Sequence, residues 1–188
     1  MSALRYIALC GNPKSGKSTV QKILGDLYGV LPVDDGMCLR DFAMRHLGLG
    51  LLDVSTQEGK SRQTKILGKS WENRKILGEL GAVLENLFGE HIMPWVATRG
   101  LKGNGAYSFG SVRKTQGRFF KEQFGPEAVI VEVRRNGAGP SGNAFDTYDR
   151  SAVDMVIDNS GTIDDLKAVV SILFDGKVQS RPAGFDVV

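Results

Sequence analysis

Residues 11–18 have the types and the spacing that phosphate binding requires. They read Gly-Asn-Pro-Lys-Ser-Gly-Lys-Ser and fit the pattern G-x-x-x-x-G-K-[ST]. Glycines allow a tight turn in which successive backbone N–H groups point inward and can hold an anion. Lys17 can then neutralise the β- and γ-phosphates of a nucleotide, and the Ser18 hydroxyl can ligate Mg²⁺. We therefore predict a P-loop that binds a nucleoside triphosphate.

The elements on either side of this segment are those that a P-loop needs. Residues 5–10, Arg-Tyr-Ile-Ala-Leu-Cys, form a short apolar run typical of a buried central strand. After the loop, apolar residues recur at helical spacing and predict one buried helix face, with Gly29 as its stop. The members of that face are Val20, Ile23, Leu24 and Leu27.

The rest of the chain alternates strand-like and helix-like segments, which favours a parallel sheet with helices on both faces. Further strands are expected at residues 30–33, 106–112, 128–133 and 154–158, and helices at 37–47, 90–101 and 114–124. A last helix is expected after a capping box at 162–165, with a buried stripe of Ile163, Leu166, Val170 and Leu173. We predict a single α/β domain over residues 1–188, in which helices flank a parallel five-stranded sheet as three layers.

Two stretches of the sequence have weaker patterns. Residues 48–69 are polar and punctuated by glycine, so we predict mostly loop there, with Ser70 capping the next helix and Glu72 in its first turn. Residues 136–149 are rich in Gly, Pro, Ser and Asn and predict a mobile loop, and residues 175–188 predict a loose tail.

Composition excludes several classes of protein. The chain has 188 residues, 41% of them hydrophobic and 24% charged, which is an ordinary globular balance. A net charge of +3 does not demand a nucleic-acid partner. Two cysteines form no disulfide framework or zinc spacing, and no apolar run is long enough to span a membrane. The N-terminus reads as a first strand and not as a signal peptide, so we expect a soluble cytoplasmic protein with neither a nucleic-acid nor a membrane partner.

Five segments give the chain a resemblance to a known family. They are residues 8–19, residues 35–41 (Asp-Gly-Met-Cys-Leu-Arg-Asp), residues 71–81 (Trp-Glu-Asn-Arg-Lys-Ile-Leu-Gly-Glu-Leu-Gly), Val112-Arg113, and residues 156–166 (Val-Ile-Asp-Asn-Ser-Gly-Thr-Ile-Asp-Asp-Leu). Over about residues 5–173 the chain resembles the deoxynucleoside monophosphate kinases of bacteriophages, within the adenylate-kinase-like P-loop kinases. The resemblance implies transfer of the γ-phosphate of ATP to a (deoxy)nucleoside monophosphate, and the host cytoplasm as the location if a phage encodes the chain.

The resemblance also implies roles for individual residues. Residues about 36–101 would form a helical part that binds the acceptor, and residues about 135–150 a short lid loop. Asp35, Arg40, Arg74 and Arg134 would bind the acceptor, and Asp35 would serve the metal with Ser18. Lys17, Arg113 and Arg135 would act in catalysis. ATP would be held by Gly11, Asn12, Pro13, Lys14, Ser15, Gly16, Lys17, Ser18, Thr19 and Asn159.

Two departures from the family pattern keep alternatives open. Ser111 stands where the family has an Asp before [VT]-R, and Gly117 stands where it has a Glu. The chain could therefore be a kinase of another small molecule, such as dephospho-coenzyme A or shikimate. It could also be a nucleotide-binding switch without transfer activity. No N/T-K-x-D pattern supports a GTPase, and the sequence leaves both a monomer and a homodimer open.

Overall fold

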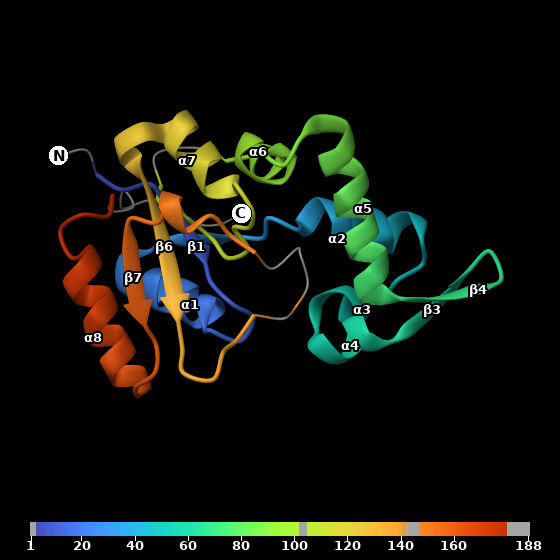
Figure 1. Cartoon of the computed structure of the whole chain (residues 1–188), viewed down its shortest axis with the longest axis horizontal. Coiled ribbons are helices and arrows are strands. Elements are labelled where there is room, and N and C mark those ends of the chain that lie inside the picture. The colour runs from blue at the N-terminus through green and yellow to red at the C-terminus, as the bar shows by residue number, and fades with distance from the viewer. Residues whose placement is uncertain (1–2, 102–104, 141, 143–146, 180–188) are drawn as a thin grey trace. The chain divides into compact units, whose positions relative to one another are not determined.

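Five parallel strands form the central sheet in the computed structural model, which describes residues 3–101, 105–140, 142 and 147–179. The strand order is β2-β5-β1-β6-β7, and every neighbouring pair is parallel. Strands β1, β6 and β7 are labelled in Figure 1. The bounds are β1 Tyr6–Cys10, β2 Leu31–Val33, β5 Tyr107–Phe109, β6 Ala128–Arg134 and β7 Met155–Asp158. The predicted α/β class and the parallel five-stranded sheet are confirmed.

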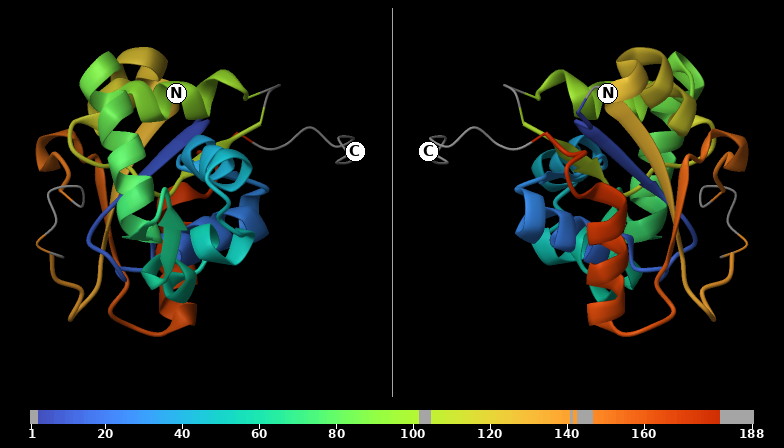
Figure 2. Two further views of the ribbon diagram at one scale, coloured as in Figure 1. Left: turned by 90° about the vertical axis from the view of Figure 1, so that its right-hand side faces the viewer. Right: turned by 90° about the vertical axis from the view of Figure 1, so that its left-hand side faces the viewer.

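The sheet belongs to the first of two compact units, which comprises residues 1–34 and 100–188. Helices α1 (Lys17–Tyr28) and α8 (Ile163–Phe174) pack on the sheet face that carries Leu9, Val131 and Ile157. Helix α7 (Gln116–Phe124) packs on the other face, where the Phe120 ring lies 4.6 Å from that of Phe109. These three layers can be followed in Figure 2. Two single 3-10 turns, η1 (Gly125–Glu127) and η3 (Arg150–Ala152), flank β6 and β7 in the sequence.

The second unit comprises residues 35–99 and has its own small core. Its helices are α2 Met37–His46, α3 Leu51–Ser55, α4 Gln57–Ser61, α5 Asn73–Phe88 and α6 Ile92–Arg99, and its hairpin strands are β3 Gln63–Ile66 and β4 Lys69–Glu72. The core consists of Ala43, Leu49, Val54 and Ile76, which come from α2, α3, α5 and the segment after α2. This unit accounts for most of the helices expected after residue 36.

The prediction of loop for residues 48–69 is wrong. The segment contains α3, α4 and the first strand of an antiparallel hairpin whose turn places Leu67 and Gly68 at φ 50° and 79°. Helix α4 forms because the Thr56 hydroxyl accepts a hydrogen bond from the Gly59 N–H, at 2.9 Å. Helices of five residues are too short to show a hydrophobic period, so the sequence pattern could not reveal them.

The start of the following helix also differs from the prediction. Ser70 lies in β4 and does not cap a helix, and α5 begins at Asn73 with Glu72 as its N-cap residue. The Asn73 side chain is fully buried. It donates to the Gly59 carbonyl at 2.9 Å and accepts from the Thr64 hydroxyl at 2.6 Å. These two long-range bonds fix where the hairpin ends and the helix starts.

Smaller differences occur at the ends of elements. Leu27 and Ile163 were expected in buried stripes but are 48% and 50% exposed, because each lies in a terminal turn that extends past the packed part of its helix. The tail expected to be loose pairs with the segment before β1 as far as it is described, since the Gln179 N–H donates to the Leu4 carbonyl at 2.9 Å. None of the described helices is both long enough and apolar enough to cross a lipid bilayer.

Candidate phosphate-binding site

The loop between β1 and α1 has the backbone that the motif predicts. Gly11 and Gly16 adopt φ 134° and 103°, and Lys14 adopts φ 65°. A Cβ on Gly11 would lie 2.3 Å from the Val133 carbonyl oxygen, and a Cβ on Gly16 would lie 2.0 Å from the Asn159 side chain. The loop therefore passes so close to the ends of β6 and β7 that only glycine fits at both positions.

Lys17 and Ser15 supply the polar groups of this loop. The Lys17 ammonium donates to the carbonyls of Gly11 and Asn12, at 2.7 and 3.0 Å, which holds it against the loop. The Ser15 hydroxyl is buried and has no hydrogen-bond partner among the described residues. Buried polar groups nearly always have a partner, so an orphaned hydroxyl here fits a loop built to receive a ligand. The first-turn N–H groups of α1 add the positive end of the helix dipole.

Asn159 and Asn12 fasten the loop to the neighbouring strands. The Asn159 side chain donates to the Ser15 carbonyl at 2.8 Å, and its backbone N–H donates to the Arg134 carbonyl at 2.7 Å. The Asn12 side chain donates to the Ala138 carbonyl at 2.8 Å. Asn159 thus lies beside the P-loop and holds its shape, while its expected role in holding ATP remains a prediction.

The carboxyl ends of the parallel strands gather several sequence-predicted residues at one edge of the sheet, where α/β proteins bind ligands. Arg113 follows β5 and is exposed, and its backbone N–H donates to the Gln116 side chain at 3.0 Å. Arg134 ends β6, and Arg135 follows it, both exposed. Asp35, Arg40 and Arg74 belong instead to the second unit, and their roles toward an acceptor remain predictions. The lid loop expected at about 135–150 includes residues 141 and 143–146, which lie outside the described part of the chain.

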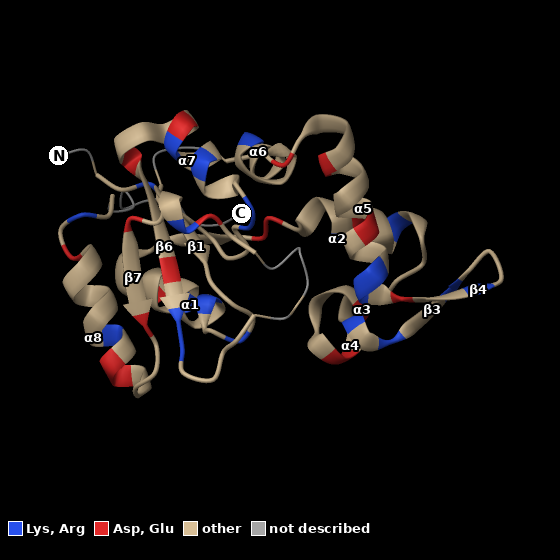
Figure 3. Cartoon of the chain, viewed as in Figure 1, with Lys and Arg blue, Asp and Glu red and all other residues tan. Residues whose placement is uncertain are grey.

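A buried carboxylate that the sequence analysis missed lies at the centre of a charged cluster. Figure 3 shows an acidic band within β6. Glu132 is the acid of this strand; it lies between apolar residues, and its side chain is 2% exposed. One carboxylate oxygen bonds Arg134 at 2.8 Å, and the other accepts from the Tyr148 hydroxyl and faces Arg150 at 3.7 Å. The signal available in the sequence was a single acid within the run Ala-Val-Ile-Val-Glu-Val, but nothing there identified its partners.

The partners of Glu132 set its ionisation. The hydrogen bond from Arg134 lowers the pKa of the Glu132 carboxyl, against the upward effect of burial, and Tyr148 and Arg150 lower it further. Burial and the same carboxylate raise the pKa of Tyr148. Burial raises the pKa of the Cys10 thiol to about 12, with Glu132 adding to the shift. Glu132 is therefore charged at neutral pH, whereas Cys10 stays a neutral thiol that packs in the core as a small apolar side chain.

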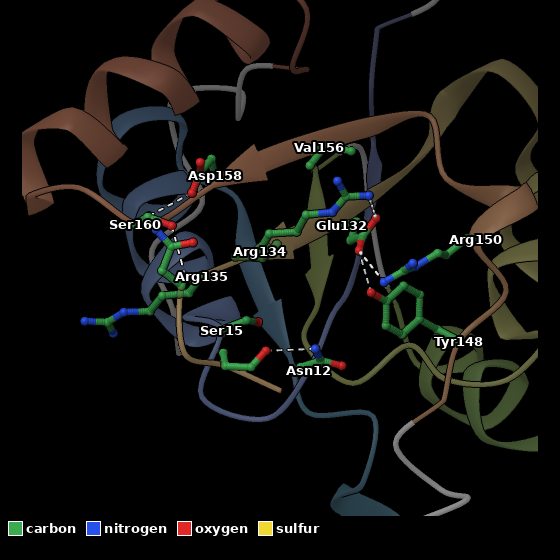
Figure 4. A pocket seen from close by; sticks show the side chains of 13 residues that line it. Asn12, Ser15, Glu132, Arg134, Arg135, Tyr148, Arg150, Val156, Asp158 and Ser160 are labelled. Atoms are coloured by element: carbon green, nitrogen blue, oxygen red, sulfur yellow. Dashed lines mark hydrogen bonds and ion pairs between the residues drawn. The ribbon is translucent and has the colours of Figure 1, made fainter. Parts of the chain in front are cut away.

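A cavity of about 340 Å³ connects the P-loop to this cluster (Figure 4). The P-loop contributes Asn12 and Ser15 to its wall, and both arginine partners of Glu132 line it as well. Figure 4 shows Arg135 extending away from Glu132, whereas Arg134 and Arg150 turn toward it. The remaining lining residues are Glu132, Val133, Arg135, Asn136, Ala138, Tyr148, Val156, Asp158 and Ser160. The arginines and the orphaned Ser15 hydroxyl give this cavity the chemistry of an anion site.

The residues present also fit a magnesium ion brought in with a nucleotide. Within the described ranges no group of three or more His, Cys, Asp or Glu side chains could form a complete metal cage. Mg²⁺ bound to nucleotides needs only one or two protein ligands, because phosphates and water supply the others. Ser18 is exposed in the first turn of α1, and Asp34 follows β2 in the same unit. Ser18 can therefore serve as the protein ligand of a nucleotide-bound ion.

Comparison with known proteins gives similarities at the level of solved structures only. No protein-family model matches the chain, and no curated protein matches it. A dephospho-CoA kinase from Campylobacter jejuni is 14% identical with a TM-score of 0.44, over 94% of this chain and 98% of that one. A sugar kinase from a Janibacter species is 13% identical with a TM-score of 0.44, over 95% and 99%. A gluconokinase from Sinorhizobium meliloti is 12% identical with a TM-score of 0.42, over 93% and 96%. Similarities this low establish no family for this chain.

Proposed function

We propose that this protein is an ATP-dependent phosphotransferase whose acceptor is a (deoxy)nucleoside monophosphate. The observation that carries the proposal is the loop at residues 11–18. It combines left-handed glycines, a lysine ammonium held over the loop, an orphaned buried hydroxyl and a helix N-terminus in one place. This combination suits the polyphosphate tail of a nucleotide and has no evident purpose without one.

Phosphoryl transfer asks the protein mainly to position two anions and to neutralise their charge. The loop amides and Lys17 bind the β- and γ-phosphates, and Ser18 ligates the Mg²⁺ that comes with them. An oxygen of the acceptor then attacks the γ-phosphorus, and the bond from that phosphorus to the β,γ-bridging oxygen breaks, which releases ADP. Arg113 and Arg135 neutralise charge on the transferring group, since a planar guanidinium can bind two phosphate oxygens at once.

The acceptor is proposed from the family resemblance. Arg40 and Arg74 of the second unit would grip the acceptor monophosphate, with Asp35 beside it or beside the metal. In this proposal the partners are small nucleotides, no nucleic acid or membrane is involved, and the protein acts in the cytoplasm. A kinase of another small molecule, such as dephospho-coenzyme A, would use the same P-loop with a different acceptor pocket.

A second candidate function is a nucleotide-binding switch without transfer activity. The observation that favours it is Ser111, which follows β5. The family that the sequence resembles has an Asp at this place, which helps to hold the metal. A switch would keep the loop and bind a nucleotide without any acceptor.

Calorimetric binding and an acceptor panel together test both functions. We expect the wild-type protein to bind ATP with Mg²⁺ and to phosphorylate at least one deoxynucleoside monophosphate. Lys17→Ala should weaken nucleotide binding or transfer by about 10²-fold or more, because the loop loses the ammonium group that neutralises the β- and γ-phosphates. Lys22→Ala is the matched control, since this exposed lysine of α1 pairs with Asp26 at 2.6 Å. If the protein phosphorylates only a non-nucleotide acceptor, the proposed acceptor class is wrong and the proposed phosphotransferase activity stands. Binding without turnover on any acceptor would support the switch.

A further inference from the structure

Burial of the Glu132 carboxylate within β6 costs free energy of folding. A carboxylate buried in the middle of a sheet loses its hydration, and well-packed apolar residues in such a place are often as stable or more stable. The neighbouring positions of β6 are apolar, so an apolar side chain would continue the pattern of the strand. The carboxylate therefore calls for an explanation beyond the stability of the fold.

The arginine partners of Glu132 are exposed to the cavity, which suggests a role in ligand binding. In an ion pair that serves only the core, both partners would be expected to be buried. Here the side chains of Arg134 and Arg150 are 55% and 70% exposed, and both line the cavity that Asn12 and Ser15 of the P-loop also line. The buried carboxylate thus holds two guanidinium groups that remain open to a ligand (Figure 4).

The two arginines come from segments that the sequence separates. Arg134 is the last residue of β6, and Arg150 begins the 3-10 turn that precedes β7. The Tyr148 hydroxyl bonds Glu132 at 2.5 Å, and the guanidinium carbon of Arg150 lies 5.8 Å from the centre of the Tyr148 ring. Glu132 is thus the group on which both arginines and the tyrosine converge.

The backbone that carries Arg150 is fixed by contacts that do not involve Glu132. The Lys114 N–H donates to the Thr147 carbonyl at 2.6 Å, and the Asp149 N–H donates to the Lys114 carbonyl at 2.8 Å. Arg118 of α7 also pairs with Asp149 at 2.6 Å. A change at Glu132 should consequently alter the direction of the guanidinium groups more than the course of the chain.

We propose that Glu132 is a positioning residue that holds Arg134 and Arg150 on the cavity wall beside the P-loop, where the two guanidinium groups bind phosphate oxygens of the nucleotide. The charges agree with this assignment, because the cavity is lined by three arginines (Arg134, Arg135 and Arg150) and two carboxylates (Glu132 and Asp158), which leaves it net positive. Each guanidinium has five N–H donors, so contact with Glu132 leaves donors for a ligand. Holding the long arginine side chains in place before binding reduces the entropy lost on binding. This inference rests on the proposed nucleotide binding and extends it to residues outside the P-loop. It gives Arg134 to the donor nucleotide, whereas the family resemblance implied that Arg134 would bind the acceptor.

The test uses nucleotide affinity, so it does not depend on knowing the acceptor. Dissociation constants for ATP with Mg²⁺ are measured by calorimetry on the full chain for wild type, Glu132→Gln, the double variant Arg134→Gln/Arg150→Gln, and the triple variant. Glutamine keeps the size of the side chain and can still hydrogen-bond Tyr148, so the fold should survive. We expect Glu132→Gln to weaken binding about tenfold in the wild-type background and less than about twofold in the double variant, because its effect passes through the arginines.

The matched control is Lys167→Gln, which removes an exposed ion pair to Asp164 on α8, at 3.0 Å, and changes no residue that lines the cavity. It should leave affinity within about twofold of wild type. Tyr148→Phe removes one hydrogen bond to the carboxylate without changing any charge and should weaken binding about threefold, which gives a second measurement if Glu132→Gln is poorly folded.

Two results would overturn the inference while leaving the proposed function intact. One is a wild-type protein that binds ATP while Glu132→Gln or, if that variant is poorly folded, Tyr148→Phe binds it equally well. The other is a loss of ATP affinity on Glu132→Gln that is equally large in the wild-type background and in the double variant Arg134→Gln/Arg150→Gln. A wild-type protein that binds no nucleotide would overturn the proposed function and this inference together.

Discussion

At the scale of single residues, burial decides what each polar group around the P-loop can do. Ser15 is buried without a partner, Glu132 is buried with three, and Cys10 is buried as a neutral thiol whose pKa is about 12. The three residues lie at the carboxyl ends of the central strands or in the loop that follows. A buried polar group without a hydrogen-bond partner destabilises the fold. Each of these groups therefore requires a protein or ligand partner of matching hydrogen-bonding chemistry.

The ionisation of Glu132 predicts how stability depends on pH. Arg134 holds the pKa of the Glu132 carboxyl below its ordinary value. A carboxyl with a lowered folded pKa adds stability above its unfolded pKa, about 4.3, and loses it as pH falls through the folded pKa. The difference in unfolding free energy between wild type and Glu132→Gln should therefore be nearly constant at about pH 6–7 and shrink below about pH 4. Urea denaturation across this range measures it.

The control for this measurement is an exposed carboxylate in the same unit. Asp164 pairs with Lys167 at 3.0 Å on the surface of α8, so Asp164→Asn should change stability by no more than about 0.5 kcal/mol at any pH in the series. A difference for Glu132→Gln that grows as pH falls would show instead that burial raises the pKa of Glu132.

At the scale of elements, close backbone approaches decide where short helices and loops can form. The P-loop passes against β6 and β7 at Gly11 and Gly16, and α4 passes against α3 at Gly59. At each of these close approaches the residue is glycine, which has no side chain to clash with the neighbouring segment. Hydrogen bonds nearby then fix the path of the chain. The second unit depends on this device because its helices α3 and α4 have only five residues each.

Two glycines in helices of the second unit give a matched prediction for stability. A Cβ on Gly59 would lie 1.9 Å from the Leu52 carbonyl oxygen, whereas a Cβ on Gly78 of α5 meets nothing within 4 Å. Gly59→Ala should therefore destabilise the protein by about 2 kcal/mol or more, because backbone must move to admit the methyl group. Gly78→Ala should stabilise it by about 0.5–1 kcal/mol, since alanine favours the helix.

Thermal or urea denaturation of the two variants measures this contrast. Equal effects of the two alanines on the unfolding free energy would show that α3 and α4 do not approach each other as closely as the structure indicates.

At the scale of the whole molecule, the chain divides its candidate functional residues between two units. The first unit carries the P-loop, the arginines that follow β5 and β6, and the cavity beside Glu132. The second unit, residues 35–99, carries Arg40 and Arg74 on α2 and α5. If the proposed function is right, the donor nucleotide and the acceptor are recognised largely by different parts of the chain.

This division predicts that a substitution in the second unit can change the KM for the acceptor without changing the affinity for ATP. Arg74 of α5 is exposed, and its guanidinium donates to the Gln57 side chain at 2.8 Å, which leaves further donors for a phosphate. Arg74→Gln should raise the KM for the acceptor monophosphate by about tenfold or more, because a charged hydrogen bond to phosphate is lost, and should leave the dissociation constant for ATP unchanged. Steady-state kinetics and calorimetry measure the two quantities.

Arg45→Gln serves as the control, since Arg45 on α2 is exposed and pairs with Asp41 at 2.7 Å. Loss of ATP affinity in Arg74→Gln, with an unchanged KM for the acceptor, would contradict the assignment of the acceptor to the second unit.

The sequence by itself determined the features that depend on neighbours along the chain. The P-loop, the five strand segments, the helix after the loop and the capping box of α8 at Thr162 all follow from short patterns. Such patterns report local backbone preference and the period of apolar residues, which is why they identified a parallel α/β sheet. The residues that lie where strands end could also be predicted, because parallel strands present their carboxyl ends at one edge.

Only the tertiary structure decided which distant groups meet. Residues 48–69 form two short helices and part of a hairpin because Asn73 bonds back to Gly59 and Thr64, and no period within the segment records that. Glu132 could be noticed in the sequence as an acid within an apolar strand, but its pairing with Arg150 requires the chain to leave β6 and return beside it. Electrostatic partners are chosen by distance in space, and a local pattern carries no information about that distance.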